Sequence, residues 1–357
     1  MYEQVWVNVI SGVLAGLLGV LATAAMVGTA RTVRQREVQR FFGAARGKRV
    51  TIRLSNIYAR EGGTVPVTIA LKGFTGPTTT AAEYHYALKI ADNFTSQPAP
   101  EWLVRLVRIL PVGRQVDLRL DVKIRLSPSP IGPFGGQRAI DSYTPVDDTE
   151  YARPDPAAVP SGTGSRLPAP VTDRISKLMN HEGTLIVIGG PTYNAMTFYL
   201  LENCLEEHRH FTFLRHEMGE SEFRRGIQVN HHHLRPDNTY APERFYRSQT
   251  DDREAFVEYF ILQRLPWDNG RLTVFLCAGT STAATVAAVR QLAEWRSLER
   301  QFGRLPFAAL YRLETDDKEL TAVEWQSPEW WEPTLLWAWP RSAARHLAPP
   351  AHSLDDL

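Results

Sequence analysis

Two stretches of the sequence decide the fold: GTLIVIGGPTYN at residues 183–194 and GRLTVFLCAGTST at residues 270–282. Each begins with an apolar run, passes through glycine, and leads into a segment with apolar residues at helical spacing. Unbroken apolar strands that alternate with helices are typical of a parallel sheet covered on both faces. The two strand–glycine–helix units therefore predict a Rossmann-like, mostly parallel, doubly wound α/β domain over residues 171–340.

The rest of the body divides at a proline-rich stretch. Residues 144–170 contain six prolines and no apolar run, which predicts a linker. Residues 50–143 combine alternating apolar patterns with one clear helical pattern at 76–94, so a smaller α/β domain is expected there. The last residues, 341–357, have the composition of a disordered tail.

The chain begins with a long uncharged stretch, because residues 5–30 include no Asp, Glu, Lys or Arg. At about 1.5 Å per helical residue this length spans the ~30 Å hydrocarbon core of a bilayer, which predicts a single transmembrane helix. A cleaved signal peptide is the alternative, but no Lys or Arg precedes the stretch and the apolar run is too long for one. Gly12 and Gly16 form a small-xxx-small pattern that suits a homodimer, although glycine is common in membrane helices in any case.

A basic segment follows the uncharged stretch. Residues 31–49 hold seven Lys or Arg residues and one acidic residue. Basic residues directly after a span stay in the cytoplasm, so we expect the N-terminus outside the cell membrane and the C-terminal domains in the cytoplasm. The residues expected to contact anionic lipid head groups are Arg31, Arg34, Arg36 and Arg40. A nucleic-acid patch is the alternative reading. However, the whole chain carries a net charge of only +1 although residues 31–49 are strongly basic, so the body that follows them must be acidic. No nucleic-acid partner is therefore expected.

Two loops in the larger domain carry the residues expected to bind a ligand. In a doubly wound sheet, ligands lie beyond the carboxyl ends of the strands, where both glycine-containing loops fall. Glycine allows close approach of the backbone, and each loop opens a helix whose N-terminal amides favour an anion. The expected ligand-binding residues are Gly189, Gly190, Thr192, Asn194, Gly279, Thr280, Ser281 and Thr282. The alternative is that glycine only permits a tight turn and that the polar residues only cap the helices.

The stretch LIVIGGPTYN at residues 185–194 resembles the opening of nucleoside 2-deoxyribosyltransferases. It also resembles Rossmann-like nucleotide sensors and NAD-cleaving effectors of bacterial conflict systems, some of which are tethered by one N-terminal membrane helix. The resemblance covers this stretch and the domain plan. It implies a nucleotide or NAD as ligand, and a carboxylate as nucleophile if the protein is an enzyme. Glu202 and Glu83 are the candidate carboxylates, although neither occupies a position defined by a motif, and Glu83 also fits the third position of a capping box.

Histidine and cysteine point to no further chemistry. Residues 231–233 are consecutive histidines, whose side chains alternate between faces in an extended chain, and no zinc-type spacing occurs, so no metal site is expected. Cys204 and Cys277 are expected to be buried, reduced and inert. The sequence thus predicts a membrane-anchored cytoplasmic protein that binds a nucleotide-type ligand, as a sensor or as an effector that cleaves a glycosidic bond. A non-catalytic, membrane-tethered scaffold is the alternative.

Overall fold

The structure is a computed structural model. The residues that it describes are 12–16, 19, 22–23, 26, 33–44, 49–55, 57–58, 77–78, 81–94, 120–127, 169–191, 194–217, 223–234, 240–247, 249–250, 256–315 and 333–340. Two predicted features lie outside them: nearly all of the linker at 144–170, and the tail at 341–357.

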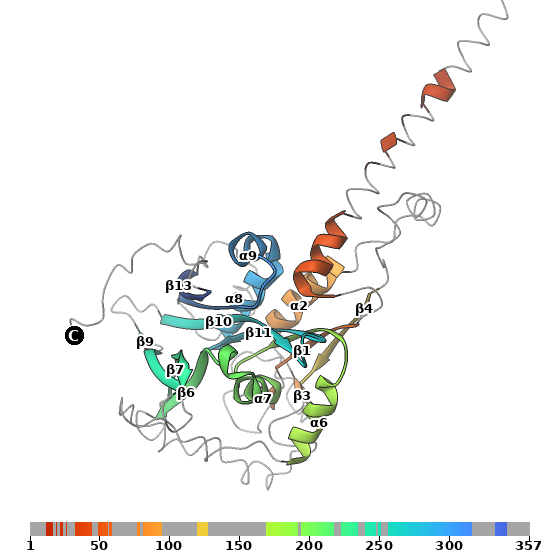
Figure 1. Cartoon of the computed structure of the whole chain (residues 1–357). Helices are drawn as coiled ribbons and strands as arrows, with labels where there is room; N and C mark the ends of the chain where they lie inside the picture. The colour runs from red at the N-terminus through yellow and green to blue at the C-terminus, as the bar shows by residue number, and fades with distance from the viewer. Residues whose placement is uncertain are drawn as a thin grey trace, which may run out of the picture.

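A mixed α/β fold is confirmed, with one large sheet at its centre (Figure 1). The order across the sheet is β13 (Thr334–Trp339), β12 (Phe307–Thr315), β10 (Phe256–Trp267), β11 (Leu272–Gly279), β5 (Gly183–Ile188), β1 (Arg49–Leu54) and β4 (Asp121–Leu126). Strands β11, β5, β1 and β4 are parallel, and the sequence predicted this arrangement for β5 and β11. The short strand β9 (Gln249–Thr250) pairs with β10.

The other half of the sheet is antiparallel, an arrangement that the prediction of a mostly parallel sheet did not specify. The reason is the short connection between β10 and β11. Asp268, Asn269 and Gly270 all have positive φ, and the amide of Gly270 bonds to the carbonyl of Trp267 at 3.1 Å. Two strands joined by so short a turn must run antiparallel.

Helices cover both faces of the sheet (Figure 1). One face packs against residues 33–42, α2 (Ala81–Phe94), α8 (Thr282–Ala293) and α9 (Trp295–Phe302). The other face packs against α6 (Ala169–Met179), α7 (Ala195–Asn203) and a small antiparallel sheet. That sheet consists of β6 (Phe211–Glu217), β7 (Phe223–Leu234) and β8 (Tyr240–Arg247). A two-stranded sheet pairs β2 (Ile57–Tyr58) with β3 (Pro77–Thr78), and the 3₁₀ helix η2 (Glu206–His208) follows α7.

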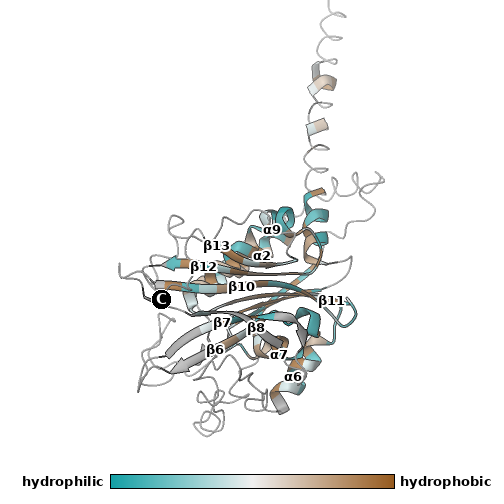
Figure 2. Cartoon of the chain, turned by 60° about the vertical axis from the view of Figure 1, so that its left-hand side comes forward, coloured by the Kyte–Doolittle hydropathy of each residue, from teal (hydrophilic) through white to brown (hydrophobic). Residues whose placement is uncertain are grey.

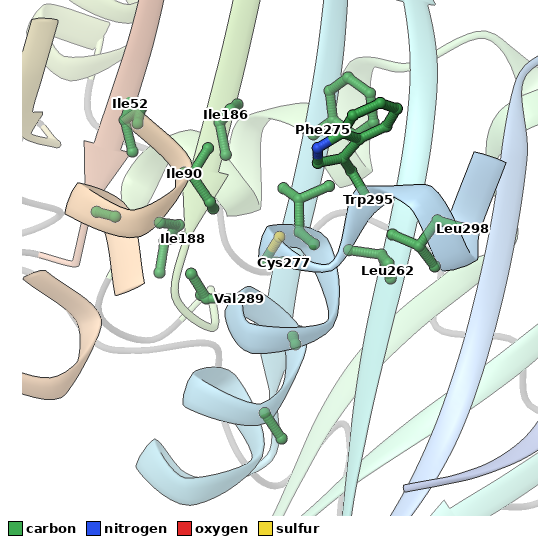
Figure 3. Packing of buried hydrophobic residues seen from close by; sticks show 14 of the residues in the cluster. Ile52, Ile90, Ile186, Ile188, Leu262, Phe275, Cys277, Val289, Trp295 and Leu298 are labelled. Atoms are coloured by element: carbon green, nitrogen blue, oxygen red, sulfur yellow. The ribbon is translucent and has the colours of Figure 1, made fainter. Parts of the chain in front are cut away.

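The two segments expected to be separate domains, 50–143 and 171–340, share this sheet. β1 and β4 come from the first segment and pair in parallel with β5 of the second. Their core is also shared, since Ile52 of β1, Ile186 of β5 and Ile90 of α2 belong to one cluster of buried side chains (Figure 3). The linker therefore separates two parts of the chain but not two sheets.

The basic segment at 31–49 is partly a core element, a role that was not predicted from the sequence. Residues 33–42 are helical, and Val38, Phe41 and Phe42 are fully buried at i, i+3, i+4 spacing. Ring centroids of Phe42 and Phe94 lie 4.8 Å apart, and the hydroxyl of Thr184 donates to the carbonyl of Phe42 at 2.8 Å. Arg34 and Arg40 remain exposed, while Arg31 lies outside the described residues.

The helices on this face are amphipathic. Figure 2 shows α9 largely in the hydrophilic colour, and its buried residues are Trp295, Leu298 and Phe302.

The described residues 12–16 stand away from the sheet in Figures 1 and 2, with Val13 58% and Leu14 54% exposed. Most of the stretch 5–30 lies outside the described residues. Among the described residues, no helix has both the length and the hydropathy needed to cross a membrane.

Candidate functional site

The chain order makes the boundary between β1 and β5 a topological switch point. The helix that follows β1, α2, packs on one face of the sheet, whereas α7, which follows β5, packs on the other. Such a switch point opens at the carboxyl ends of the two strands and is the usual ligand position in α/β sheets.

Both predicted loops meet at this end of the sheet. The amide of Gly189 donates to the carbonyl of Cys277 at 2.9 Å. A Cβ atom added at Gly190 would lie 3.0 Å from the carbonyl oxygen of Gly279. The two loops are therefore neighbours at one end of the sheet, although the helices that they open, α7 and α8, pack on opposite faces.

The polar residue of the first loop serves the fold. Asn194 is fully buried and is the N-cap of α7, where its Oδ1 accepts from the amides of Met196 at 3.0 Å and Thr197 at 3.4 Å. Its Nδ2 donates to the carbonyl of Ile188 at 2.7 Å. Asn194 was expected to touch a ligand, but this amide group is already used in capping and in closing the turn. Thr192 lies outside the described residues.

Glycine is required at two positions of the loops. Gly189 has φ +117°, and a Cβ there would collide with the hydroxyl of Ser55. A Cβ at Gly279 would collide with the backbone and side chain of Ala284 on α8. At both positions glycine is needed because a larger residue would prevent the strands and helices from packing closely. This supports the alternative that these glycines serve the fold and not a ligand.

The polar residues of the second loop are also partly committed. Thr280 is buried, donates its hydroxyl to the carboxylate of Glu258 on β10, and accepts from the amide of Tyr259 at 3.0 Å. Ser281 caps α8 by accepting from the amide of Ala284 at 3.1 Å. Thr282 is the first residue of α8 and is partly exposed, as are Ser281 and Gly190. The surface left for a ligand is thus mostly backbone at two helix N-termini.

A buried carboxylate adjoins this surface. Ser55 follows β1 directly, and its hydroxyl donates to Oε1 of Glu83 at 3.0 Å. Both residues are buried, and Ser55 also lies against Gly189. Glu83, in the first turn of α2, therefore lies at the carboxyl end of β1, beside the switch point. The sequence offered no signal for Ser55 beyond its place at the end of a strand.

The second candidate carboxylate lies elsewhere. Glu202 is exposed near the C-terminal end of α7, eight residues beyond the cap and about 12 Å along the helix axis. Glu202 and the glycine loops are not brought together.

The two cysteines are buried, and no disulfide joins them. Burial raises the pKa of Cys204 to about 11 and raises the pKa of Cys277 still further above its ordinary value. At neutral pH both thiols therefore favour the protonated form, which is the less nucleophilic one. Within the described part of the chain, no three His, Cys, Asp or Glu side chains gather closely enough to hold a metal ion.

No family model, curated protein or solved structure matches this chain. Function is therefore inferred from the geometry of the site.

Proposed function

We propose that this protein is a membrane-anchored α/β protein whose switch-point crevice binds an anionic, nucleotide-type ligand. The observation that carries the proposal is the adjacency of the two glycine loops, with Gly190 directly beside the carbonyl of Gly279. One ligand would then face the N-termini of α7 and α8 together.

The physical support is the field of the two helices. A helix N-terminus carries roughly half a positive elementary charge and stabilises a nearby anion by about 0.3–1 kcal/mol. Ser281 caps only the amide of Ala284, so the amides of Thr282 and Ala283 at the start of α8 are outside that cap. Glycine at 190 leaves the meeting point of the two loops free of a side chain, since a Cβ there would lie 3.0 Å from the carbonyl oxygen of Gly279.

The proposal has two forms, a sensor and an effector, which differ in whether the buried carboxylate takes part. A sensor needs only the backbone surface, whereas an effector that cleaves a glycosidic bond also needs a nucleophile or an acid. Glu83 is the carboxylate in position for that role, held by the hydroxyl of Ser55. NAD or another nucleotide supplies both a phosphate for the helix N-termini and a glycosidic bond.

Membrane anchoring through residues 5–30 is part of the same proposal. The exposed apolar side chains Val13, Leu14 and Met26 suit a lipid environment, and Gly12 and Gly16 have open space around them that a second helix could fill. Arg34 and Arg40 are exposed where lipid head groups would lie. The body would then lie in the cytoplasm.

The test is calorimetry on the full chain in a nonionic detergent with NAD and with the common nucleotides. We expect saturable heat with at least one of them. Gly190→Val should abolish that heat, because its side chain fills the meeting point of the two loops, without changing the far-UV circular dichroism. Gly12→Val is the matched control, since it places the same side chain in open space far from the crevice. Absence of heat with every nucleotide would refute the proposal.

A scaffold without a ligand is the second candidate. It is favoured by the use of Asn194, Thr280 and Ser281 in capping and packing, which explains these residues without a ligand. In that case Gly190→Val changes only thermal stability, and no nucleotide alters the melting temperature of the unmutated protein or of the variant.

A further inference from the structure

Three arginines gather near the carboxyl ends of β1 and β4. Arg53 is the penultimate residue of β1 and pairs in parallel register with Arg125 of β4 and with Val187 of β5. Register partners on parallel strands point to the same face, and Val187 belongs to the core beneath α6 and α7. Arg53 and Arg125 therefore lie on the face that carries α6, the helix of Arg174.

Arg53 is almost completely buried, with 8% of its surface exposed. Its Nη1 donates to the carbonyl of Leu126, the last residue of β4, at 3.1 Å. Its Nε is buried, and in the described part of the chain it has no hydrogen-bond partner. A buried donor left unpaired is costly, and more so when the group is charged.

The surroundings of Arg53 add positive charge. Burial, and then the charges of Arg125 and Arg174, lower the pKa of Arg53 to about 10. Arg125 and Arg174 are both exposed, and no salt bridge between described residues includes any of the three arginines. Like charges side by side on a sheet are destabilising, so this cluster gains stability when an anion joins it.

We propose that Arg53, Arg125 and Arg174 form an anion-binding site for a phosphate or a phosphate ester. Arg125 and Arg174 would meet the anion at the surface, and Arg53 would offer its unpaired Nε from below, in the forked geometry that guanidinium groups use with phosphate. The site goes beyond the crevice ligand, because it uses neither glycine loop. α6 covers the face opposite to residues 33–42 (Figures 1 and 2), so a soluble phosphate fits this position better than a lipid head group.

The test uses the full chain in a nonionic detergent, with inorganic pyrophosphate added at constant ionic strength. We expect a saturable rise in melting temperature and saturable heat in calorimetry. Arg53→Met should abolish both. Arg125→Gln and Arg174→Gln should each weaken the apparent Kd about tenfold, the usual effect of losing one charge-assisted hydrogen bond. If Arg53→Met does not fold, the two surface variants decide.

Arg271→Gln is the control, because Arg271 is an exposed arginine paired with Glu182 and Asp268 outside this cluster. It should leave the response to pyrophosphate unchanged. The proposal is wrong if pyrophosphate has no effect, or if Arg271→Gln weakens the response as much as Arg125→Gln does. A further experiment measures binding to vesicles rich in anionic lipid. If the protein binds these vesicles through Arg53 but does not bind pyrophosphate, the proposal of a soluble phosphate ligand is also wrong. Gly190→Val should retain the pyrophosphate response, so failure of the crevice proposal is distinguishable from failure of this one.

Discussion

At the residue scale, His208 shows how burial alone gives a histidine a measurable effect on folding. It lies on η2 against Trp339, with ring centroids 5.9 Å apart, and its side chain is nearly inaccessible. In the described structure its Nδ1 has no hydrogen-bond partner, and its Nε2 is 3.6 Å from the exposed carboxylate of Glu207. Burial lowers the pKa of His208, and Glu207 only partly offsets this.

The pKa shift of His208 predicts a pH-dependent stability. Because its pKa is lowered in the folded state, the unfolded chain binds more protons once the pH falls below about 6.5. The free energy of unfolding should therefore decrease from pH 7.5 to pH 5.5. His208→Phe should flatten this dependence in urea titrations. Exposed Arg304, which pairs with Glu299, offers a control, since Arg304→Gln should leave the dependence unchanged. An unchanged slope in His208→Phe would contradict the assignment to His208.

At the element scale, the beginning of α7 is held by one side chain. Asn194→Ala removes the cap of α7 and also leaves the buried carbonyl of Ile188 without its 2.7 Å bond. We expect a loss of about 1–3 kcal/mol in the free energy of unfolding, measured by urea denaturation. Asn203→Ala, at the exposed end of the same helix, should cost less than about 0.5 kcal/mol. Equal losses of unfolding free energy in the two variants would contradict the stabilising role of the Asn194 cap.

Elements whose pattern is local could be predicted, and elements that depend on distant partners could not. The apolar runs of β5 and β11 and the helices after them were predicted because burial on both faces leaves a clear mark. The positions of Gly189 and Gly279 followed, since parallel strands end at one edge. The role of Asn194 did not, because caps and phosphate sites use the same residue types. Thr280 was unpredictable for another reason: its partner Glu258 lies on a different strand.

Some of the signals were present but outweighed. Residues 268–270 read Asp-Asn-Gly, a strong hairpin signal, yet the helices around β11 favoured a parallel arrangement. In residues 33–42, the density of arginines concealed the spacing of Val38, Phe41 and Phe42, which is that of a helix facing a core. The small sheet β6–β8 left little pattern, and most of its side chains lie outside the described residues.

At the scale of the whole molecule, residues 33–42 join the proposed anchor to the body. Phe41 lies against Phe275 of β11, with ring centroids 5.5 Å apart, and Phe42 lies 5.0 Å from the same ring. The body therefore includes chain that lies upstream of β1. A boundary drawn at residue 50, where the strand pattern begins, would remove part of the core.

Two deletions separate anchoring from folding. Deleting residues 2–30 should move the protein from the membrane fraction to the soluble fraction and leave the melting temperature of the body unchanged, because the described residues of that stretch stand away from the sheet. Deleting residues 2–48 also removes Phe41 and Phe42, each worth about 3–5 kcal/mol when a buried aromatic is lost. That second protein should aggregate or melt far earlier. If the two shortened proteins melt at the same temperature, residues 33–42 do not stabilise the core. If the protein that lacks residues 2–30 stays in the membrane fraction, residues 5–30 are not the anchor.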